Sequence, residues 1–167
     1  MDRPVTCLRG RTSDRTDGAG QGAEALAREL GGVPVVHSDD FYLPMDGDPL
    51  RWWEPFRTQV LVPLLSGHEG RFRRYDWRSD SFAEDVVTPP APIVIVEGVG
   101  SAWRPATPYL SLSIWVDAPL KVRVSRTEHR DGPEAAPLWE SWRKSEAQHF
   151  THDRTQARAD LTVDGTA

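Results

Sequence analysis

Short runs of apolar residues recur along the chain, separated by longer polar stretches. Four runs are clear and a fifth is weaker, and each ends in a polar residue or a glycine or is directly followed by a polar residue. They cover residues 4–8, 33–36, 92–98 and 110–117, with the weaker run at 159–165. Continuous apolar runs of this length are typical of strands covered on both faces, which indicates a parallel sheet.

The segments between these runs carry apolar residues at helical spacing. Helices are predicted over 22–32, 54–67, 119–130 and 134–150. The alternation of strands and helices predicts an α/β fold, in which right-handed crossovers place helices on both faces of a five-stranded parallel sheet. We expect one three-layer domain over 1–167, because this length suits a single hydrophobic core.

Carboxylates follow two of the predicted strands. Asp39 and Asp40 come after the second strand in "HSDDFYLP", and Glu97 ends the third in "IVIVEG". Ligands of such sheets bind at the carboxyl ends of the strands, and an unpaired carboxylate is costly to bury, so these residues are candidates for a site. Together they can hold Mg²⁺ or accept a proton from a hydroxyl. The paired aspartates equally suit a capping role in the following turn.

Composition narrows the class of partner. The net charge is −5 with acids and bases interspersed, which argues against nucleic acid as a partner. No apolar run approaches the ~20 residues of a membrane span, and "MDRPVTC" lacks a signal-peptide pattern. The single cysteine, Cys7, is compatible with a reducing compartment. We expect a cytoplasmic protein without a membrane partner, acting on a small-molecule substrate.

Five motifs occur in an order and spacing that resemble one enzyme family. They are "VVHSDDFYLP", "RRYDW", "IVIVEG", "WVDAP" followed by "RVSRTEHRDG", and "RADLTVDG". Together they resemble the uridine kinase-like P-loop kinases, which include nicotinamide riboside kinases, across nearly the whole chain. The resemblance implies a phosphotransferase that uses Mg²⁺ and ATP to phosphorylate a hydroxyl of a nucleoside-like metabolite.

The resemblance also implies roles for single residues. Asp39 would be the base that receives the proton of the hydroxyl, and Glu97 would be linked to magnesium or substrate, so the pair forms the implied metal site. The substrate pocket would contain Asp40, Tyr42, Tyr75, Asp76 and Trp77. Without the family pattern, Tyr75 and Trp77 would be interpreted as ordinary core aromatics.

A lid is implied after the "VDAP" motif, over about residues 126–137. Arg126 and Arg130 correspond to the family's lid arginines, which touch phosphates. The alternative is that these arginines, four residues apart on a helix, form a solvated face.

The stretch "TCLRGRTSDRTDGAGQGAEALAREL" departs from the family pattern of a strand, a G-x-x-x-x-G-K-[ST] loop and a helix. Counted from the strand, Gly10, Arg11 and Thr12 match the start of the loop. Arg15 and Thr16 then occupy the glycine-lysine positions. This counting supplies no lysine.

The same stretch can be counted from the predicted helix. Ala23 then replaces the lysine, and Glu24 replaces the magnesium-binding hydroxyl. Joining the two countings requires an insertion of about seven residues within "SDRTDGAGQG". The loop is therefore rebuilt, beyond a single replacement of its lysine.

The rebuilt loop keeps some features of a phosphate site. Gly18, Gly20 and Gly22 permit close backbone approach, and a helix N-terminus still attracts anions. The missing group is a cation on the transferring phosphate, where one positioned donor is worth on the order of 10²–10³ in rate. An arginine such as Arg15 is a candidate replacement, whereas Glu24 would repel the triphosphate.

Two classes of function therefore remain open. The first is a nucleoside-like kinase in which an arginine replaces the lysine, with ATP bound at least about tenfold more weakly than by an intact loop. The second is a protein that keeps the kinase fold and the acceptor pocket but no longer uses ATP, and either catalyses another reaction or only binds a metabolite.

Overall fold

The computed structural model describes residues 5–10, 18–42 and 47–166, and the side chains of 19–42 and 47–166. Within these ranges, none of the helices is long and apolar enough to cross a membrane.

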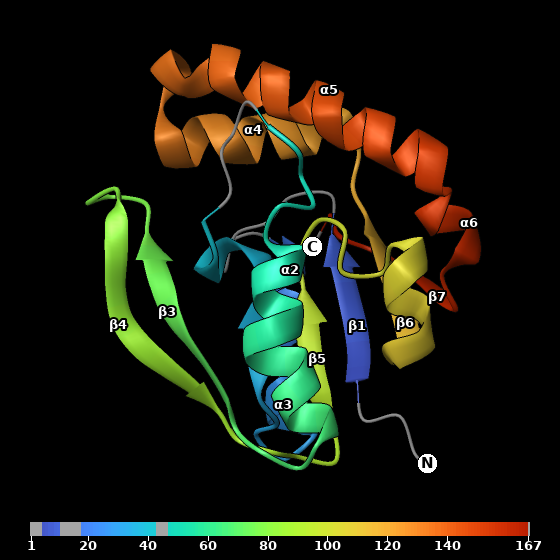
Figure 1. Cartoon of the computed structure of the whole chain (residues 1–167). Coiled ribbons are helices and arrows are strands. Elements are labelled where there is room, and N and C mark those ends of the chain that lie inside the picture. Colours follow the sequence, from blue (N-terminus) through green and yellow to red (C-terminus); the bar gives the residue numbers. More distant parts are fainter. Residues whose placement is uncertain (1–4, 11–17, 43–46, 167) are drawn as a thin grey trace.

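The central sheet has the strand order β2-β5-β1-β6-β7, and every neighbouring pair is parallel (Figure 1). The strands are β1 (Val5–Gly10), β2 (Val35–His37), β5 (Val94–Glu97), β6 (Leu110–Asp117) and β7 (Leu161–Asp164). This confirms the predicted α/β class with a parallel sheet. Because the strands are parallel, all five have their carboxyl ends at one edge of the sheet. The polar residues that follow the strands therefore lie along the same edge.

Residues of β5 alternate between two hydrophobic clusters on opposite faces of the sheet. Ile95 packs against α1 (Gly18–Glu29), together with Ala23, Ala27 and Ile114. Val94 and Val96 belong to the larger cluster on the other face. Helices thus cover both faces, because residues next to each other in a strand point to opposite sides.

The larger cluster is covered by one helical segment with a π-helical centre. It consists of α2 (Trp53–Phe56), the π-helical η2 (Arg57–Leu61) and α3 (Val62–Leu65). The predicted helix over 54–67 corresponds to this segment. Pro63 has no N–H to donate to the carbonyl four residues earlier, and a π-bulge is a common way to accommodate such a break.

A two-stranded antiparallel hairpin, separate from the main sheet, was not predicted. It consists of β3 (Gly70–Asp76) and β4 (Ser81–Thr88). Gly70, Phe72 and Tyr75 are buried, while the neighbouring Arg71 and Arg73 are exposed. Gly70 is required by packing, because a Cβ there would lie 2.8 Å from the Cα of Val60.

Two helices lie beyond the carboxyl ends of the strands, α4 (Leu120–Asp131) and α5 (Ala136–Asp153) (Figure 1). The short helices are η1 (Ser38–Asp40), η3 (Arg104–Tyr109), η4 (Pro133–Ala135) and α6 (Thr155–Arg158). The segment predicted as a lid, about 126–137, covers the end of α4, η4 and the start of α5.

Candidate functional site

The polar segment after β2 forms the centre of the candidate site. Asp39 and Asp40 lie in η1, directly beyond the carboxyl end of β2; Asp40 is buried and Asp39 is partly exposed. Ser38 Oγ donates a hydrogen bond to Asp39 Oδ1 at 3.3 Å. Asp39 is thus the more accessible of the two carboxylates.

Glu97 lies at the same edge of the sheet. It is the last residue of β5 and pairs in register with His37 of β2, so Asp39 follows the strand next to it. Gly98 permits the close approach of the two segments, because a Cβ at Gly98 would lie 1.9 Å from Ser38 Oγ. The φ of Gly98 is +130°, which also favours glycine.

A buried histidine links Glu97 to α1. His37 Nδ1 lies 3.0 Å from Glu97 Oε2, and His37 Nε2 lies 3.0 Å from Glu24 Oε1. The side chains of His37 and Glu97 are 2% and 1% exposed, and that of Glu24 is 44% exposed. With an acceptor at each ring nitrogen, the imidazole is held by two carboxylates on different elements.

The charge state of His37 follows from these contacts. Burial opposes protonation, but hydrogen bonds to Glu97 and Glu24 and the charges of Glu97 and Asp40 together raise the pKa of His37. A protonated imidazole donates to both carboxylates. Sequence reasoning missed this residue; the available signal was a histidine between an apolar strand and the "SDD" segment.

Tyr42, two residues after η1, and aromatic residues of the hairpin meet beside Asp39. The Tyr42 ring lies 4.8 Å from that of Tyr75, and the Tyr75 ring lies 5.0 Å from that of Trp77. Trp77 Nε1 donates to the backbone carbonyl of Asp39 at 2.8 Å, which fixes the hairpin tip to η1. The structure therefore brings Asp39, Tyr42, Tyr75 and Trp77 together.

A cleft of about 450 Å³ lies between η1, α2, η2 and the hairpin; we call it the hairpin cleft. It is lined by Phe41, Tyr42, Arg51, Pro55, Gln59, Arg73 and Phe82. Arg73 is held by the carbonyls of Phe82 and Ala83. The volume of the hairpin cleft is within the range of small-molecule sites.

Two of the predicted pocket residues have local partners in the hairpin. Asp76 accepts hydrogen bonds from the Arg78 amide and the Ser79 hydroxyl, each at 2.9 Å, and these bonds lower the pKa of Asp76. The Tyr75 hydroxyl donates to Asp80, which raises the pKa of Tyr75 to about 12. Both side chains thus also shape the turn.

The predicted lid arginines have protein partners. Arg126 donates to the Gly165 carbonyl at 2.8 Å, near the end of β7. Arg130 forms two hydrogen bonds with Asp131, at 2.8 and 2.7 Å, and its guanidinium lies 4.9 Å from the centre of the Trp139 ring. Trp139 Nε1 donates to the same carboxylate, which ties the end of α4 to α5.

The glycine-rich stretch is described in part. Gly10 ends β1, whereas Arg11, Thr12 and Arg15 lie outside the described residues. The helix was predicted to begin at residue 22, but α1 begins at Gly18, so Gly18, Gly20 and Gly22 are helical. The expectation that these glycines form a loop is corrected accordingly.

The structure also tests the alignment of this stretch with the G-x-x-x-x-G-K-[ST] pattern that was counted from the helix. Ala23 is fully buried against Ile95 and Ile114. A lysine at position 23 would enter this apolar cluster, so the counting from the helix does not describe a phosphate cation site. Glu24, which was expected to repel a triphosphate, bonds to His37.

The side chains of the candidate site can be tested against the Mg²⁺ ion that the family resemblance implies. The described residues contain no group of three or more His, Cys, Asp or Glu side chains that could hold a metal ion. Mg²⁺, however, commonly takes one or two protein carboxylates together with substrate phosphates and waters. Asp39 and Glu97 lie at the edge where such an ion would arrive with a phosphate; Asp39 is the accessible ligand, whereas Glu97 is 1% exposed and bonded to His37.

Comparison with known proteins identifies the fold. No protein-family model matches the chain, and no curated protein does either. Among solved structures, it is similar to a protein from Bacillus stearothermophilus named as a possible uridine kinase, with a TM-score of 0.67 and 19% identity over 98% of this chain and 90% of that one. A protein from Silicibacter sp. TM1040, named as a fructose transport system kinase, has a TM-score of 0.55 and 20% identity over 97% of this chain and 90% of that one. The chain thus shares the fold of these two proteins.

Proposed function

We propose that the protein is a phosphotransferase that acts on a hydroxyl of a nucleoside-like metabolite. The observation that carries this proposal is the convergence of Asp39 with the aromatic residues of the hairpin at the carboxyl edge of the sheet. A carboxylate at that edge can take a proton, and aromatic rings beside it can stack on a flat base. The similarity in fold to a possible uridine kinase supports the same class of acceptor.

In this proposal each side chain has a defined task. Asp39 accepts the proton of the attacking hydroxyl, while Tyr42 and Trp77 position the acceptor and the hairpin cleft receives its distal part. Glu97 orients His37 and thereby η1, and with Asp39 it would hold Mg²⁺. ATP with Mg²⁺ would supply the transferred phosphoryl group when bound.

The lid would have to rearrange in this reaction. Arg130 donates to Asp131 through Nε and Nη2, so release of this carboxylate would turn the same edge of the guanidinium towards a phosphate. Arg126 and Arg130 then stabilise the phosphates as the segment at about 126–137 closes over them. The exchange of one anionic partner for another keeps the guanidinium paired in both states.

A second function has its own support: the protein binds or converts a metabolite without ATP. Counted from the start of α1, Gly18, Ala19 and Gly20 stand at the G-K-[ST] positions, and this counting also lacks a lysine. The protein's only lysines, Lys121 and Lys144, belong to α4 and α5. No residue of the glycine-rich stretch lines the hairpin cleft, so binding of a metabolite there and beside Asp39 does not require that stretch.

Calorimetry with Mg²⁺ and ATP, followed by a phosphoryl-transfer assay with uridine and related nucleosides, separates the two functions. Saturable ATP binding with product formation supports the kinase. Nucleoside binding without ATP binding or turnover supports the second function. Absence of nucleoside binding, whatever ATP does, would refute an acceptor site at the hairpin cleft for this class of molecule.

A further inference from the structure

A second cleft lies between α4, α5 and α6, and we call it the helix cleft. Its volume is about 840 Å³, larger than that of the hairpin cleft, and the two share no lining residue. It is lined by Trp115, Leu120, Arg123, Glu140, Arg143, Lys144, Glu146, Ala147, Phe150, Thr151, Arg154, Gln156 and Ala157. None of these residues has a part in the proposed phosphoryl transfer.

The floor of the helix cleft is apolar and rigidly supported. Trp115 and Phe150 are both buried, with ring centres 5.1 Å apart in an edge-to-face arrangement. Ala147, one turn before Phe150 on α5, leaves room above these rings. A flat or aliphatic hydrocarbon placed here would lose its contact with water against Ala147, which is exposed, and the 9% of Phe150 that is exposed, while Trp115, 0% exposed, supports Phe150 from within.

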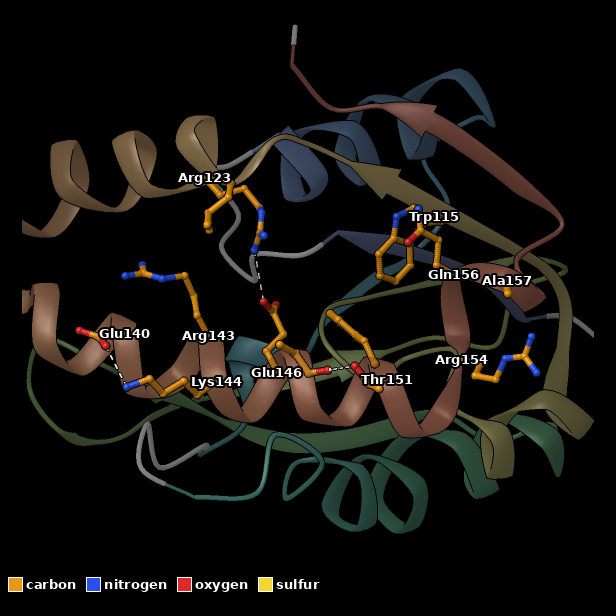
Figure 2. A pocket seen from close by; sticks show the side chains of 13 residues that line it. Trp115, Arg123, Glu140, Arg143, Lys144, Glu146, Thr151, Arg154, Gln156 and Ala157 are labelled. Atoms are coloured by element: carbon orange, nitrogen blue, oxygen red, sulfur yellow. Dashed lines mark hydrogen bonds and ion pairs between the residues drawn. The ribbon is translucent and has the colours of Figure 1, made fainter.

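A buried ion pair crosses the base of the cleft. Arg123 of α4 lies 3.4 Å from Glu146 of α5, and their side chains are 8% and 3% exposed (Figure 2). Arg123 Nε also donates to the Ala118 carbonyl at 3.2 Å. These contacts join the two helices, so the walls of the cleft are held at a fixed separation.

The charges around the cleft favour an anion. Four cationic and two anionic side chains line it, a local excess of two positive charges in a chain of net charge −5. Lys144 is paired with Glu140 at 2.8 Å, and Arg123 is paired with Glu146. Within the part of the chain that the structure describes, the guanidinium groups of Arg143 and Arg154 form no hydrogen bond or ion pair, although the charge of Arg143, with that of Lys144, helps to lower the pKa of Glu140.

Arg143 lies on the same face of α5 as Ala147 and Phe150, and Arg154 is the left-handed residue that directly follows α5. The spacing of the two arginines, eleven positions, corresponds to about three turns, or ~16 Å along the helix. A cationic group therefore stands at each end of the apolar floor. Figure 2 shows Arg143 extending from α5 towards α4, and Arg154 at the opposite end of the cleft.

We propose that the helix cleft is a second small-molecule site, which binds an organic anion with an apolar body. The hydrocarbon part of the ligand lies on Phe150 and Ala147, and a carboxylate, sulfonate or phosphate group pairs with Arg143 or Arg154. Mostly apolar pockets with a few orienting charges are typical of such sites. Because the cleft lies between α4 and α5, a ligand bound there contacts α4, the helix that leads into the predicted lid.

Two fluorescent probes with the same aromatic rings test this site. 1-Anilinonaphthalene-8-sulfonate carries an anionic group, and N-phenyl-1-naphthylamine does not. We expect the sulfonate to bind the folded protein at one saturable site at least about tenfold more tightly than the amine, with an affinity that falls as salt rises. Equal affinity of the two probes, or affinity of the sulfonate that is independent of salt, would overturn the proposal.

Substitutions locate the bound probe. Arg143→Gln and Arg154→Gln should each weaken sulfonate binding by about fivefold and leave amine binding unchanged, because each removes one cation from the lining of the cleft. Ala147→Glu should abolish sulfonate binding by placing a carboxylate above the floor. Arg28→Gln, an exposed substitution at the end of α1, is the matched control.

The hairpin cleft offers the competing location. Arg51→Gln removes a cation from that cleft and should leave sulfonate affinity unchanged. Loss of binding in Arg51→Gln with none in Arg143→Gln and Arg154→Gln would place the probe in the hairpin cleft and refute the helix cleft as its site. An unchanged urea midpoint in each variant shows that the affinities refer to the folded protein.

Discussion

At the scale of single residues, His37 is the side chain whose environment departs most from what its sequence position indicates. It belongs to a short strand, where an apolar residue would be ordinary, yet it lies between two carboxylates. Burial of Glu97 is tolerable because this imidazole partners it. The pair therefore supports the position of η1, and with it the position of Asp39.

The raised pKa of His37 predicts a specific dependence of stability on pH. Protonated His37 is favoured in the folded state, so its contribution is fully present below about pH 6.5, the usual pKa of an unfolded histidine. It is lost as the pH rises through the higher pKa of the folded state. We expect His37→Gln to lower the free energy of unfolding by about 3 kcal/mol at pH 6, and by less at pH 9.

Urea unfolding at a series of pH values measures this difference. His68→Gln, at an exposed position before β3, is the control and should leave the pH profile of the wild type unchanged. A deficit of His37→Gln that stays constant from pH 6 to 9, or grows, would contradict a protonated His37 in the folded protein.

Asp39 carries the proposed chemistry, and its test separates catalysis from structure. Asp39→Asn keeps the shape of the side chain and removes the base, so we expect nucleoside binding to change less than about threefold while turnover falls by about 10²-fold or more. Calorimetry and the phosphoryl-transfer assay measure the two effects. Asp85→Asn, exposed on β4, is the control. Undiminished turnover in Asp39→Asn would leave Asp39 as a structural residue of η1.

At the scale of elements, α1 begins four residues earlier than the sequence predicted, at Gly18 in place of residue 22. The apolar spacing of Ala23, Leu26 and Ala27 predicted a helix, but three glycines before it suggested a loop. Glycine costs a helix only about 1 kcal/mol relative to alanine, and packing of Ala23 and Ala27 on the sheet outweighs that cost. Tertiary contacts, which composition does not reveal, thus extend the helix to Gly18.

Two substitutions in α1 should have opposite effects on stability. Gly22→Ala should stabilise the protein by about 0.5–1 kcal/mol, because a Cβ there meets nothing within 4 Å and the helix favours alanine. Ala23→Lys should destabilise it by about 3 kcal/mol, because the side chain enters the cluster around Ile95. Chemical denaturation measures both. A stable Ala23→Lys variant with gained ATP binding would restore the counting from the helix.

The hairpin was missed for a different reason. "RRYDW" was interpreted through the family motif, and a register shift between Arg73 and Tyr75 interrupts the alternation of apolar and polar residues by which a strand is predicted. The motif correctly indicated a functional region, since Tyr75 and Trp77 meet Tyr42. Pairing between β3 and β4 depends on the turn at Asp76–Ser81, where Asp80 has a φ of 51°, a conformation that the sequence alone does not specify.

At the scale of the whole molecule, apolar runs between polar ends predicted the parallel sheet, because strands covered on both faces leave a strong signal. The same rule placed Asp39 and Glu97 at one edge. Contacts between distant segments were not predictable, since they depend on register and side-chain direction. The Glu24–His37–Glu97 chain and the cleft between α4 and α5 are both of this kind.

The stability of the whole molecule in the presence of ligands distinguishes the two proposed functions. A ligand that binds only the folded state stabilises it by RT ln(1 + [L]/Kd). At about 1 mM Mg-ATP, a Kd of about 1 mM adds about 0.4 kcal/mol, whereas a Kd of about 1 μM adds about 4 kcal/mol. For a chain of this length these energies correspond to increases in Tm of about 1 °C and about 10 °C.

We expect the smaller shift with Mg-ATP, because no counting of the glycine-rich stretch supplies a lysine. A nucleoside that stacks on Tyr42 should raise Tm through the hairpin cleft whether or not ATP binds, and Tyr42→Ala should remove that rise while leaving any effect of ATP unchanged. Thermal unfolding followed by fluorescence of the seven tryptophans measures both shifts. An increase of about 10 °C with Mg-ATP that Arg15→Ala abolishes would show tight nucleotide binding through a relocated cation, because removal of one charge-assisted contact costs about tenfold or more in affinity.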